Sequence, residues 1–420
     1  MKALSPILIF LALYLGLSLV SGDFYSMPIL VAFLIASIWA IATTRSVDVE
    51  ERLRIFSRGA GNPSMLMMVW IFVLAGAFAA TAKEMGAVEQ TVNMTLSFLP
   101  GDMLLAALFI ASCIVSLSVG TSVGTIVALT PIASGVAAQT GFYLPVIVAA
   151  VAGGAYFGDN LSFISDTTII ATRSMGCRLK DKFRVNSLIV TPAALLCIVI
   201  YVVLGYGMSA TRELPDVEWL KVIPYVVVLV TAIAGMNVMM VLLVGIALTG
   251  AIGIIDGSYG LFGWFGAMNR GIVDMGELIL ITMMAGGMME IIRFNGGFKW
   301  LIDRLTRRVT DKRGAELSIG AMVMAADFCT ANNTVAIITV GGLANDIATR
   351  FGVDKRKAAS LLDTFSCMTQ GLLPYGAQVL IASSLSGVSP LQIVPYLIYP
   401  LFMGLSAIAC IFLRLPRRFS

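Results

Sequence analysis

The chain has 420 residues, of which 58% are hydrophobic and only 12% are charged, and its mean hydropathy is +0.93. That charged share is about half of what a soluble globular domain carries, so the composition excludes a soluble protein, and we expect no nucleic-acid partner. The sequence contains no histidine, which excludes His-based triads, His-ligated zinc and His proton relays. Six scattered cysteines without a CxxC pair argue against a disulfide framework or an iron–sulfur cluster.

Apolar runs recur along the whole chain. A transmembrane helix needs roughly 20 apolar residues. In chain order we predict spans at 4–20, 28–44 and 63–82, a hairpin at 102–138, a broken crossing at 142–173, spans at 186–208, 221–234, 239–255 and 274–292, a second hairpin at 314–349, a second broken crossing at 355–386 and a last span at 391–413. We therefore expect an all-α integral membrane protein, surrounded by the lipid bilayer, with about ten transmembrane helices and two re-entrant hairpins.

Basic residues set the predicted orientation, because cytoplasmic loops carry an excess of Lys and Arg. With a cytoplasmic N-terminus, basic clusters fall on the inner side at 45–58, which we take as a loop, and at 173–184, 299–313, 350–357 and 414–418. Only a few basic residues then lie outside: Lys83, Arg212, Lys221 and Arg270. Treating either hairpin as a full crossing would put later clusters on the wrong side. We therefore predict a bacterial cytoplasmic (inner) membrane protein with both termini in the cytoplasm.

The two halves of the sequence resemble each other in spacing. A shift of 211 residues places Gly76 on Gly287, Gly141 on Gly352, and the polar stretch that starts at Phe157 on the one that starts at Met368. Each half holds five predicted crossings and one hairpin, so the second half is predicted to be inverted. We divide the chain into repeat one, residues 1–209, and repeat two, residues 212–420, each with scaffold spans, a hairpin and a broken helix.

Inverted repeats with interrupted helices at matching positions are typical of secondary transporters, whose site lies at the membrane midplane. The alternative is a chance alignment of two apolar halves. The polar interruptions coincide as well as the apolar runs, which favours a true repeat.

Polar stretches break the apolar pattern at membrane depth in both halves. Unwound backbone survives there only where it is buried in protein or lines a wet cavity. Its carbonyls, hydroxyls and carboxylates suit Na⁺, and the helix N-termini beside them suit an anionic group. In repeat one we expect a hairpin tip with Thr121, Ser122 and Thr125 to face Asp159, Asn160, Ser162 and Ser165. In repeat two we expect Asn332, Asn333 and Thr334 to face Thr369, Gln370 and Gln378.

Embedded carboxylates point to ion exchange. A charge near the bilayer centre costs roughly 2.5–3.5 kcal/mol on insertion scales and usually serves a function. Asp159 and Asp166 flank a break near the middle of a crossing, where a carboxylate can exchange H⁺ for Na⁺. Asp166 also fits as the N-cap of the following half-helix. Asp327 and Asp363 lie deep in repeat two with no basic residue in hairpin or helix range, so both are further candidates.

The stretch Gly158–Thr168 (GDNLSFISDTT) resembles the G-D-x-x-S-P-x-S-D-T-T signature of the NhaC family of Na⁺/H⁺ antiporters. The upstream run Gly120–Thr125 (GTSVGT) resembles the hairpin motif of that family. In two departures, Phe163 replaces the proline of the motif and Asn160 stands where a lysine is common. The family also contains members that resemble malate/lactate exchangers and amino-acid transporters. More distantly, the layout resembles the wider ion-transporter superfamily.

The leading hypothesis is Na⁺/H⁺ antiport, with Asp159 as the exchange carboxylate and Na⁺ bound by Asp159, Asn160, Thr121 and Ser122. The alternative is a Na⁺- or H⁺-coupled carrier of a small organic acid or amino acid, held between the hairpin tips by Asn332, Asn333 and Thr334. At the position that matches Asp159, repeat two has Gln370, and this asymmetry suits a coupled carrier at least as well. We expect no enzyme activity and no cofactor besides the transported Na⁺ and H⁺. A homodimer would suit this layout.

Overall fold

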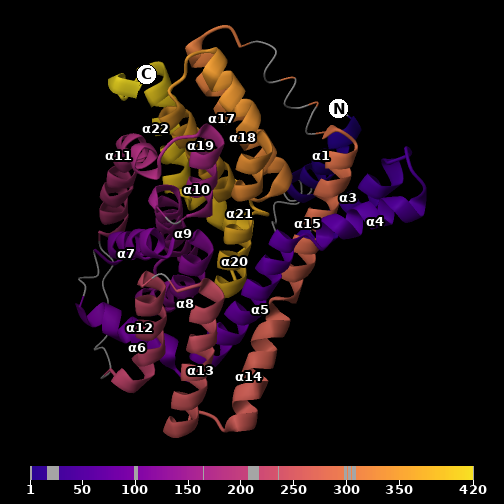
Figure 1. Ribbon diagram of the computed structural model, residues 1–420. Helices are drawn as coiled ribbons and strands as arrows, with labels where there is room; N and C mark the ends of the chain where they lie inside the picture. Colours follow the sequence, from indigo (N-terminus) through magenta and orange to yellow (C-terminus); the bar gives the residue numbers. More distant parts are fainter. Residues whose placement is uncertain are drawn as a thin grey trace.

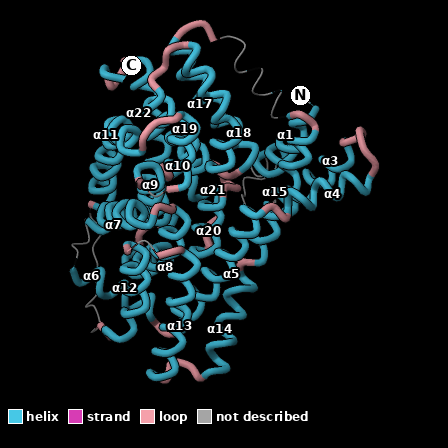
Figure 2. Tube along the Cα trace, viewed as in Figure 1, coloured by secondary structure: helices cyan, strands magenta, loops and turns pink. Residues whose placement is uncertain are grey.

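The structure is a computed structural model that describes residues 2–16, 28–98, 103–163, 165–206, 217–234, 236–297, 300, 304 and 309–419. Every regular element in these ranges is a helix (Figure 2), which confirms the predicted all-α fold. Some predicted features lie outside the described residues: the repeat boundary at 209–212, the start of the first hairpin at Asp102, Arg212, and much of the basic cluster at 299–313.

The N-terminal part of the chain contains two helices that the sequence did not predict, Val49–Ala60 and Ala87–Phe98. The described helices are α1 (Ser5–Leu11), α3 (Ile29–Thr43), α4 (Val49–Ala60), α5 (Pro63–Glu84) and α6 (Ala87–Phe98). The prediction of a basic loop at 45–58 is wrong, because α4 occupies most of it. Asp48 caps this helix by accepting a hydrogen bond from the backbone N–H of Glu51 at 2.8 Å. Its mixture of charged and apolar side chains hid it from a search for apolar runs.

The predicted hairpins and broken helices are present as interrupted helix pairs. The first hairpin consists of α7 (Leu104–Val119) and α8 (Ser122–Thr140), and the second of α17 (Lys312–Thr330) and α18 (Asn333–Arg350). The broken helices are α9 (Leu144–Leu161) with α10 (Asp166–Met175), and α19 (Lys355–Leu372) with α20 (Ala377–Ser386). At the hairpin tips the backbone turns through left-handed residues, Gly120 at φ 75° and Ala331 at φ 49°. Ala331 carries a Cβ, so its conformation is strained, whereas that of Gly120 is not.

The remaining helices frame these pairs. They are α11 (Leu179–Gly205), α12 (Trp219–Ile233), α13 (Val238–Asp256), α14 (Leu261–Asp274), α15 (Gly276–Phe294), α21 (Pro390–Ile393) and α22 (Ile398–Phe412). The sequence did not predict α14 as a separate helix, and placed the start of α11 at 186 rather than at Leu179. In Figure 1, α13 and α14 reach the bottom of the view and α5 runs obliquely toward the centre, while α7, α9, α10 and α19 lie together in the left half.

The helix boundaries repeat at the predicted spacing. A shift of 211 residues carries Leu144–Leu161 onto Lys355–Leu372 and Asp166–Met175 onto Ala377–Ser386 without a residue of difference. The breaks that follow α7 and α17 also coincide, since Val119 falls on Thr330. The secondary structure is thus repeated at this spacing. The inversion of repeat two across the membrane stays a prediction.

Glycines let two pairs of helices come into direct backbone contact. Helix α5 crosses α14 where Gly76 meets Gly271, and a Cβ added to either glycine would collide with the carbonyl oxygen of the other. Helix α4 meets α15 in the same way through Gly59 and Gly286. Small residues permit such close helix crossings in membranes. The shift of 211 residues exchanges the two pairs, because α4 corresponds to α14 and α5 to α15.

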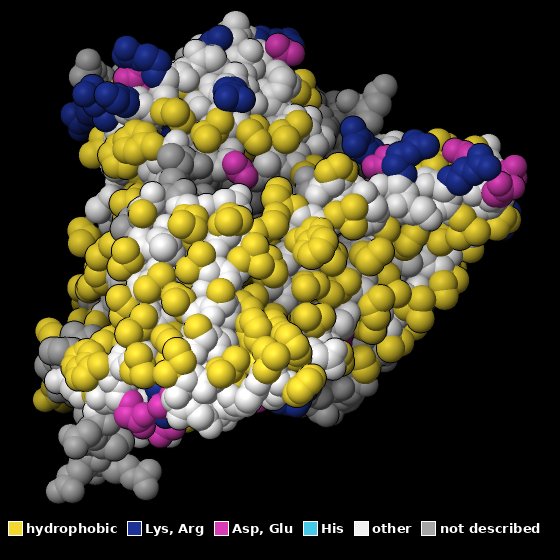
Figure 3. Space-filling model, turned by 60° about the horizontal axis from the view of Figure 1, so that its bottom comes forward, with side chains coloured by type: hydrophobic (Ala, Val, Ile, Leu, Met, Phe, Trp, Pro, Cys, Tyr) yellow, Lys and Arg dark blue, Asp and Glu magenta, His cyan; other side chains and the backbone are white. Residues whose placement is uncertain are grey.

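Several helices are suited to cross a bilayer. Within the described residues, six helices are long and apolar enough, or up to seven if the bent pair Lys355–Ser386 and Pro390–Tyr396 forms one span. Figure 3 shows a broad band of hydrophobic side chains, with charged side chains gathered at its margins. The predicted total of about ten crossings stays a prediction.

Cysteine labelling tests the re-entrant hairpins. In a cysteine-free background, we expect Met103→Cys and Ala138→Cys, at the two ends of the first hairpin, to react with an impermeant maleimide from the outer side. Both positions are exposed. Arg313→Cys and Arg350→Cys, at the ends of the second hairpin, are exposed as well and should react only from the cytoplasmic side. If the two ends of either hairpin label from opposite sides, that hairpin is an ordinary span.

Candidate functional site

The tips of both hairpins and the break in each half meet at one cavity of about 530 Å³, which we name the central cavity. Repeat one supplies Thr121, Ser122, Asp159 and Asp166 to its wall, and repeat two supplies Asn332, Asn333, Thr334 and Gln378. Side chains of α5 and residues at the start of α13 form its apolar side. Half of the predicted site residues therefore lie around a single space.

Asp159 lies in the last turn of α9, and only 6% of it is exposed. Ser122, at the first hairpin tip, donates a hydrogen bond to its Oδ2 at 2.8 Å. Ser165, beyond the break, donates to its Oδ1 at 2.8 Å. In the described part of the chain no Lys or Arg forms an ion pair with Asp159. This embedded carboxylate is therefore held by neutral groups, namely the two hydroxyls and the side chain of Asn333, which also acts on it.

Asp166 has a different position from the predicted N-cap. It is the first residue of α10, and the cap is Ser165, whose hydroxyl is directed to Asp159 and Thr167. The cap interpretation of Asp166 is therefore wrong. Its side chain is exposed and lines the central cavity at the N-terminus of α10, where the helix dipole stabilises a carboxylate.

A chain of hydrogen bonds crosses from repeat one to repeat two. Gln378 donates to the Ser122 hydroxyl at 3.0 Å. Gln370 donates to the Gln378 Oε1 at 2.9 Å and to the carbonyl of Ala331, at the second hairpin tip, at 3.0 Å. We name this series Asp159–Ser122–Gln378–Gln370–Ala331 the cross-repeat chain. It joins the embedded carboxylate to the strained residue of the second tip.

The asparagines of the second hairpin tip hydrogen-bond to the backbone at the start of α18 and also line the central cavity. Asn332 caps α18, since its Oδ1 accepts from the backbone N–H of Val335 at 3.0 Å. Asn333 accepts from the N–H of Thr334 at 3.0 Å, and its amide lies 3.9 Å from the sulfur of Cys367. With Thr334 they form one end of the central cavity.

Some predicted site residues do not face the central cavity. The Asn160 carbonyl and side-chain Oδ1 accept from Asn186 at 2.8 and 2.6 Å, so this side chain lies away from Thr121 and Ser122. The Thr125 hydroxyl donates to the Thr121 carbonyl, inside its own helix turn. Ser162 is buried at the end of α9. The predicted Na⁺ set is thus only partly assembled, because Asn160 is not with the other members.

The prediction that Asp363 has no basic neighbour is wrong. Its carboxylate forms an ion pair with Lys182 of α11, and both side chains are buried. The same ammonium donates to the Asn160 carbonyl at 2.7 Å and to the Thr168 hydroxyl at 2.9 Å. The sequence analysis placed Lys182 in a cytoplasmic cluster because it started this helix at 186. In the structure α11 begins at Leu179, so Lys182 is part of the helix and lies at the break between α9 and α10.

Other buried polar neighbours were also missed. Asn186 lies one turn after Lys182, and its Oδ1 accepts from Ser360 at 2.7 Å and from Thr364 at 2.9 Å. Lys357 forms a second buried ion pair with Glu316 at 3.0 Å. The spacing of Lys182 and Asn186 on one helix face was the signal that could have identified this polar cluster.

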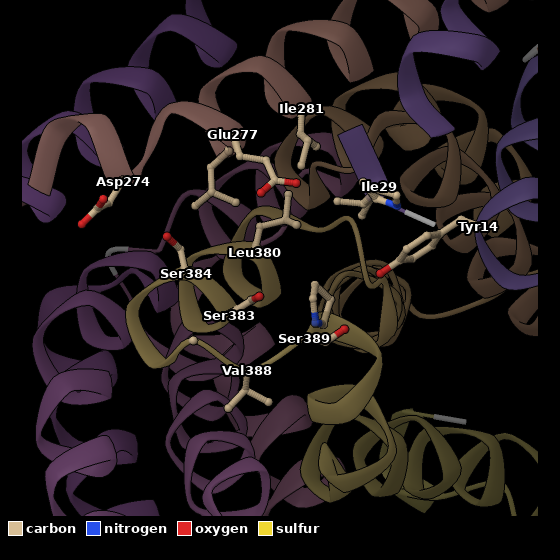
Figure 4. A pocket seen from close by; sticks show the side chains of 14 residues that line it. Tyr14, Ile29, Asp274, Glu277, Ile281, Leu380, Ser383, Ser384, Val388 and Ser389 are labelled. Carbon is tan, nitrogen blue, oxygen red and sulfur yellow. The ribbon is translucent and has the colours of Figure 1, made fainter. Parts of the chain in front are cut away.

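A second cavity of about 370 Å³ lies between α15 and α20. Figure 4 shows Glu277, Ser383 and Tyr14 around this space, with Asp274 and Ser384 at one end. None of the residues predicted for the site lines it. The embedded carboxylates are therefore associated with the central cavity or its surroundings, not with this space.

A helix broken in each half, with two hairpin tips that meet it around an embedded carboxylate, is the architecture of a secondary transporter. The chain is a multi-pass membrane protein of this class. It belongs to the Na⁺/H⁺ antiporter family, whose sequence model matches residues 3–207 and 213–415. The resemblance noted at Gly158–Thr168 is thereby confirmed over nearly the whole chain.

Named relatives agree with this assignment. The chain is 25% identical to the malate-2H⁺/Na⁺-lactate antiporter of Bacillus subtilis, over 94% of this chain and 92% of the relative. It is 22% identical to the Na⁺/H⁺ antiporter NhaC of Alkalihalophilus pseudofirmus, over 80% of this chain and 79% of the relative. Among solved structures, the YdaH transporter of Alcanivorax borkumensis matches with a TM-score of 0.45 and 13% identity, over 98% of this chain and 99% of that one.

Proposed function

We propose that this protein exchanges Na⁺ for H⁺ across a bacterial cytoplasmic membrane, with Asp159 as the exchanging carboxylate. The observation that carries the proposal is the environment of Asp159. It is nearly buried on the wall of a cavity, bonded by two hydroxyls and without an ion pair in the described chain. A carboxylate in such a place requires a positive charge beside it. A proton or a sodium ion supplies that charge, but the two exclude each other, and this competition is the basis of exchange.

The side chains around Asp159 suit this role. Na⁺ prefers oxygen ligands, as other hard cations do, and the Asp159 carboxylate has the Ser122 and Ser165 hydroxyls within 2.8 Å. Asp166 is exposed to the same cavity, so in this proposal it attracts the cation before the cation reaches Asp159. Asn160, which is bonded to Asn186, takes no part.

A second candidate is a Na⁺- or H⁺-coupled carrier of a small organic acid. The central cavity, at about 530 Å³, is far larger than one water molecule, whose share of the liquid is about 30 Å³. Its repeat-two end presents the amides of Asn332 and Asn333 and the N-terminus of α18, a combination that favours a carboxylate group. The name of the malate/lactate antiporter from Bacillus subtilis supports this candidate.

The proposal includes a membrane topology and an assembly. Residues 1–209 and 212–420 form two inverted repeats, both termini lie in the cytoplasm, and the protein is a homodimer. The repetition of helix boundaries after 211 residues supports the two repeats.

A transport assay separates the two candidates. In inverted membrane vesicles with a preformed ΔpH, we expect Na⁺ alone to collapse the gradient, because Asp159 releases its proton when Na⁺ binds. K⁺, malate, lactate and a panel of amino acids are added in turn, and vesicles without the protein are the control. A response only in the presence of an organic solute would contradict simple Na⁺/H⁺ exchange and favour the second candidate.

A further inference from the structure

Repeat two contains buried acceptor oxygens without donors. Asp327 of α17 is 0% exposed, and neither oxygen of its carboxylate has a hydrogen-bond partner among the described residues. The Oε1 of Gln370, on the adjacent helix α19, is also buried and unpartnered in the described chain. The backbones of Asn332 and Gln370 act on the Asp327 carboxyl, so the carboxyl lies between the second hairpin tip and α19. Three acceptor oxygens are therefore left without a positive partner.

The surroundings of Asp327 supply no counter-charge. The titratable groups that interact with it are Tyr156, Tyr375 and Cys329, and none of these is a base. Within the described ranges, Asp327 takes part in no ion pair, unlike Asp363. A buried carboxylate that lacks a charge partner and any side-chain donor is strongly unfavourable. The site therefore calls for a small cation or a proton.

The positions in repeat one that correspond to Asp327 and Gln370 also combine one acid with one neutral side chain. The shift of 211 residues places Gln370 on Asp159 and Asp327 on Ser116. In repeat one, the carboxylate is on the broken helix and the neutral Ser116, on the hairpin, donates to the Ala155 carbonyl at 2.6 Å. In repeat two the carboxylate is on the hairpin and the neutral amide on the broken helix. Both repeats thus place one acid at the contact between hairpin and broken helix, on opposite partners.

We infer that Asp327 and the Gln370 Oε1 form a second cation site, enclosed within repeat two, which binds Na⁺ in exchange for H⁺. The inference rests on the proposed function, since it assumes that the protein carries these ions. The cross-repeat chain connects the two sites. An ion bound to the Gln370 amide oxygen also fixes the orientation of the Gln370 NH₂ group, which donates to Gln378 and to Ala331. Through Gln378 and Ser122 this affects the hydrogen bond on Asp159.

Sodium binding to the purified full-length protein tests the inference. Equilibrium dialysis with ²²Na⁺ in detergent at alkaline pH is expected to give two bound ions per chain. Asp327→Asn should bind one, Asp159→Asn should bind one, and the double variant none. Asp346→Asn, an exposed acid of the same repeat, is the matched control and should bind two. Asp327→Ser, which installs the residue found at the equivalent position in repeat one, provides a second variant if the amide impairs folding.

The outcomes separate this inference from the proposed function. If Asp327→Asn and Asp327→Ser bind as many ions as the parent, the second site does not exist. If they lose one ion while Asp159→Asn loses none, the second site stands and the role of Asp159 is wrong. Proton release on Na⁺ addition is followed with a pH dye in the same samples. An unchanged ion count with one fewer released proton would show that Asp327 carries H⁺ alone, which overturns the sodium site.

Gln370→Leu tests the amide oxygen separately. This substitution keeps a similar side-chain size but removes the Oε1 ligand together with the donors to Gln378 and Ala331. We expect the affinity for one of the two sodium ions to fall about tenfold, as for the loss of a hydrogen bond to a charged group. An unchanged affinity at both sites would remove Gln370 from the ligand set.

Discussion

Asp159→Asn is expected to abolish Na⁺-driven proton movement in inverted vesicles. The amide keeps the size of the carboxylate, so one of Ser122 and Ser165 still donates to an oxygen, and the hydroxyl of the other can turn to accept from the new NH₂ group. It cannot bind or release a proton at physiological pH, however, and it carries no charge to attract Na⁺. The initial rate of ΔpH collapse after Na⁺ addition is the measurement, and the expected result is a loss to the level of protein-free vesicles.

The amount of protein in the membrane and a control variant show whether the loss is specific to Asp159. Removal of an embedded charge eases insertion into the bilayer, so Asp159→Asn should be present in the membrane at the parental level. Asp346→Asn removes an exposed carboxylate of α18 and should exchange like the parent. If Asp159→Asn exchanges at the parental rate at every pH tested, Asp159 is not the exchanging group, and Asp327 becomes the next candidate.

Lys182→Met is expected to destabilise the folded protein more than any other single change described here. It leaves the Asp363 carboxylate buried without its partner and removes donors from Asn160 and Thr168. Breaking one side of a buried ion pair costs about 3–5 kcal/mol. For a large chain this corresponds to a fall in apparent Tm of roughly 5–10 °C, measured in detergent by heating followed by size-exclusion chromatography.

The double variant shows whether charge is the cause. Lys182→Met with Asp363→Leu removes both buried charges, so it should recover most of the lost stability, because apolar replacements of buried pairs are often neutral. Lys355→Met, which changes an exposed lysine at the start of α19, is the matched control and should leave the apparent Tm unchanged. A double variant as unstable as Lys182→Met would indicate that the packing of the lysine stem, not the ion pair, stabilises this region.

Much of the layout could be predicted from local sequence. The breaks between α9 and α10 and between α19 and α20 coincide with polar residues inside apolar runs, and such interruptions are visible without a structure. The helices α4, α6 and α14 were missed, because charged or polar residues and, in α14, glycines interrupt their apolar patterns. A helix was therefore predictable where its residues were mostly apolar, and was missed where apolar, polar and charged residues were mixed.

The site was predictable as a set of residues but not as a set of contacts. Polar type and depth identified Asp159, Ser122 and Ser165, and the structure places them together. The pairing of Lys182 with Asp363 joins residues far apart in the chain, and it depends on the start of α11 and on the rotation of that helix. The sequence shows that Lys182 and Asn186 share a helix face but not which residue of another helix they meet, so a buried ion pair was mistaken for a solvated lysine and an unpartnered acid.

The glycine contacts between α5 and α14 have a mechanical consequence. Neither glycine has a side chain to separate the two backbones at Gly76 and Gly271, so α5 lies directly against α14 there and a Cβ at either position would force the helices apart. Met67 and Met68, on the wall of the central cavity, lie roughly 12–14 Å along α5 from Gly76, at about 1.5 Å per residue. If α5 tilted by about 10° about this contact, that wall would move by roughly 2 Å. The width of the central cavity therefore depends on the angle at which α5 crosses α14, and only glycine permits this close crossing.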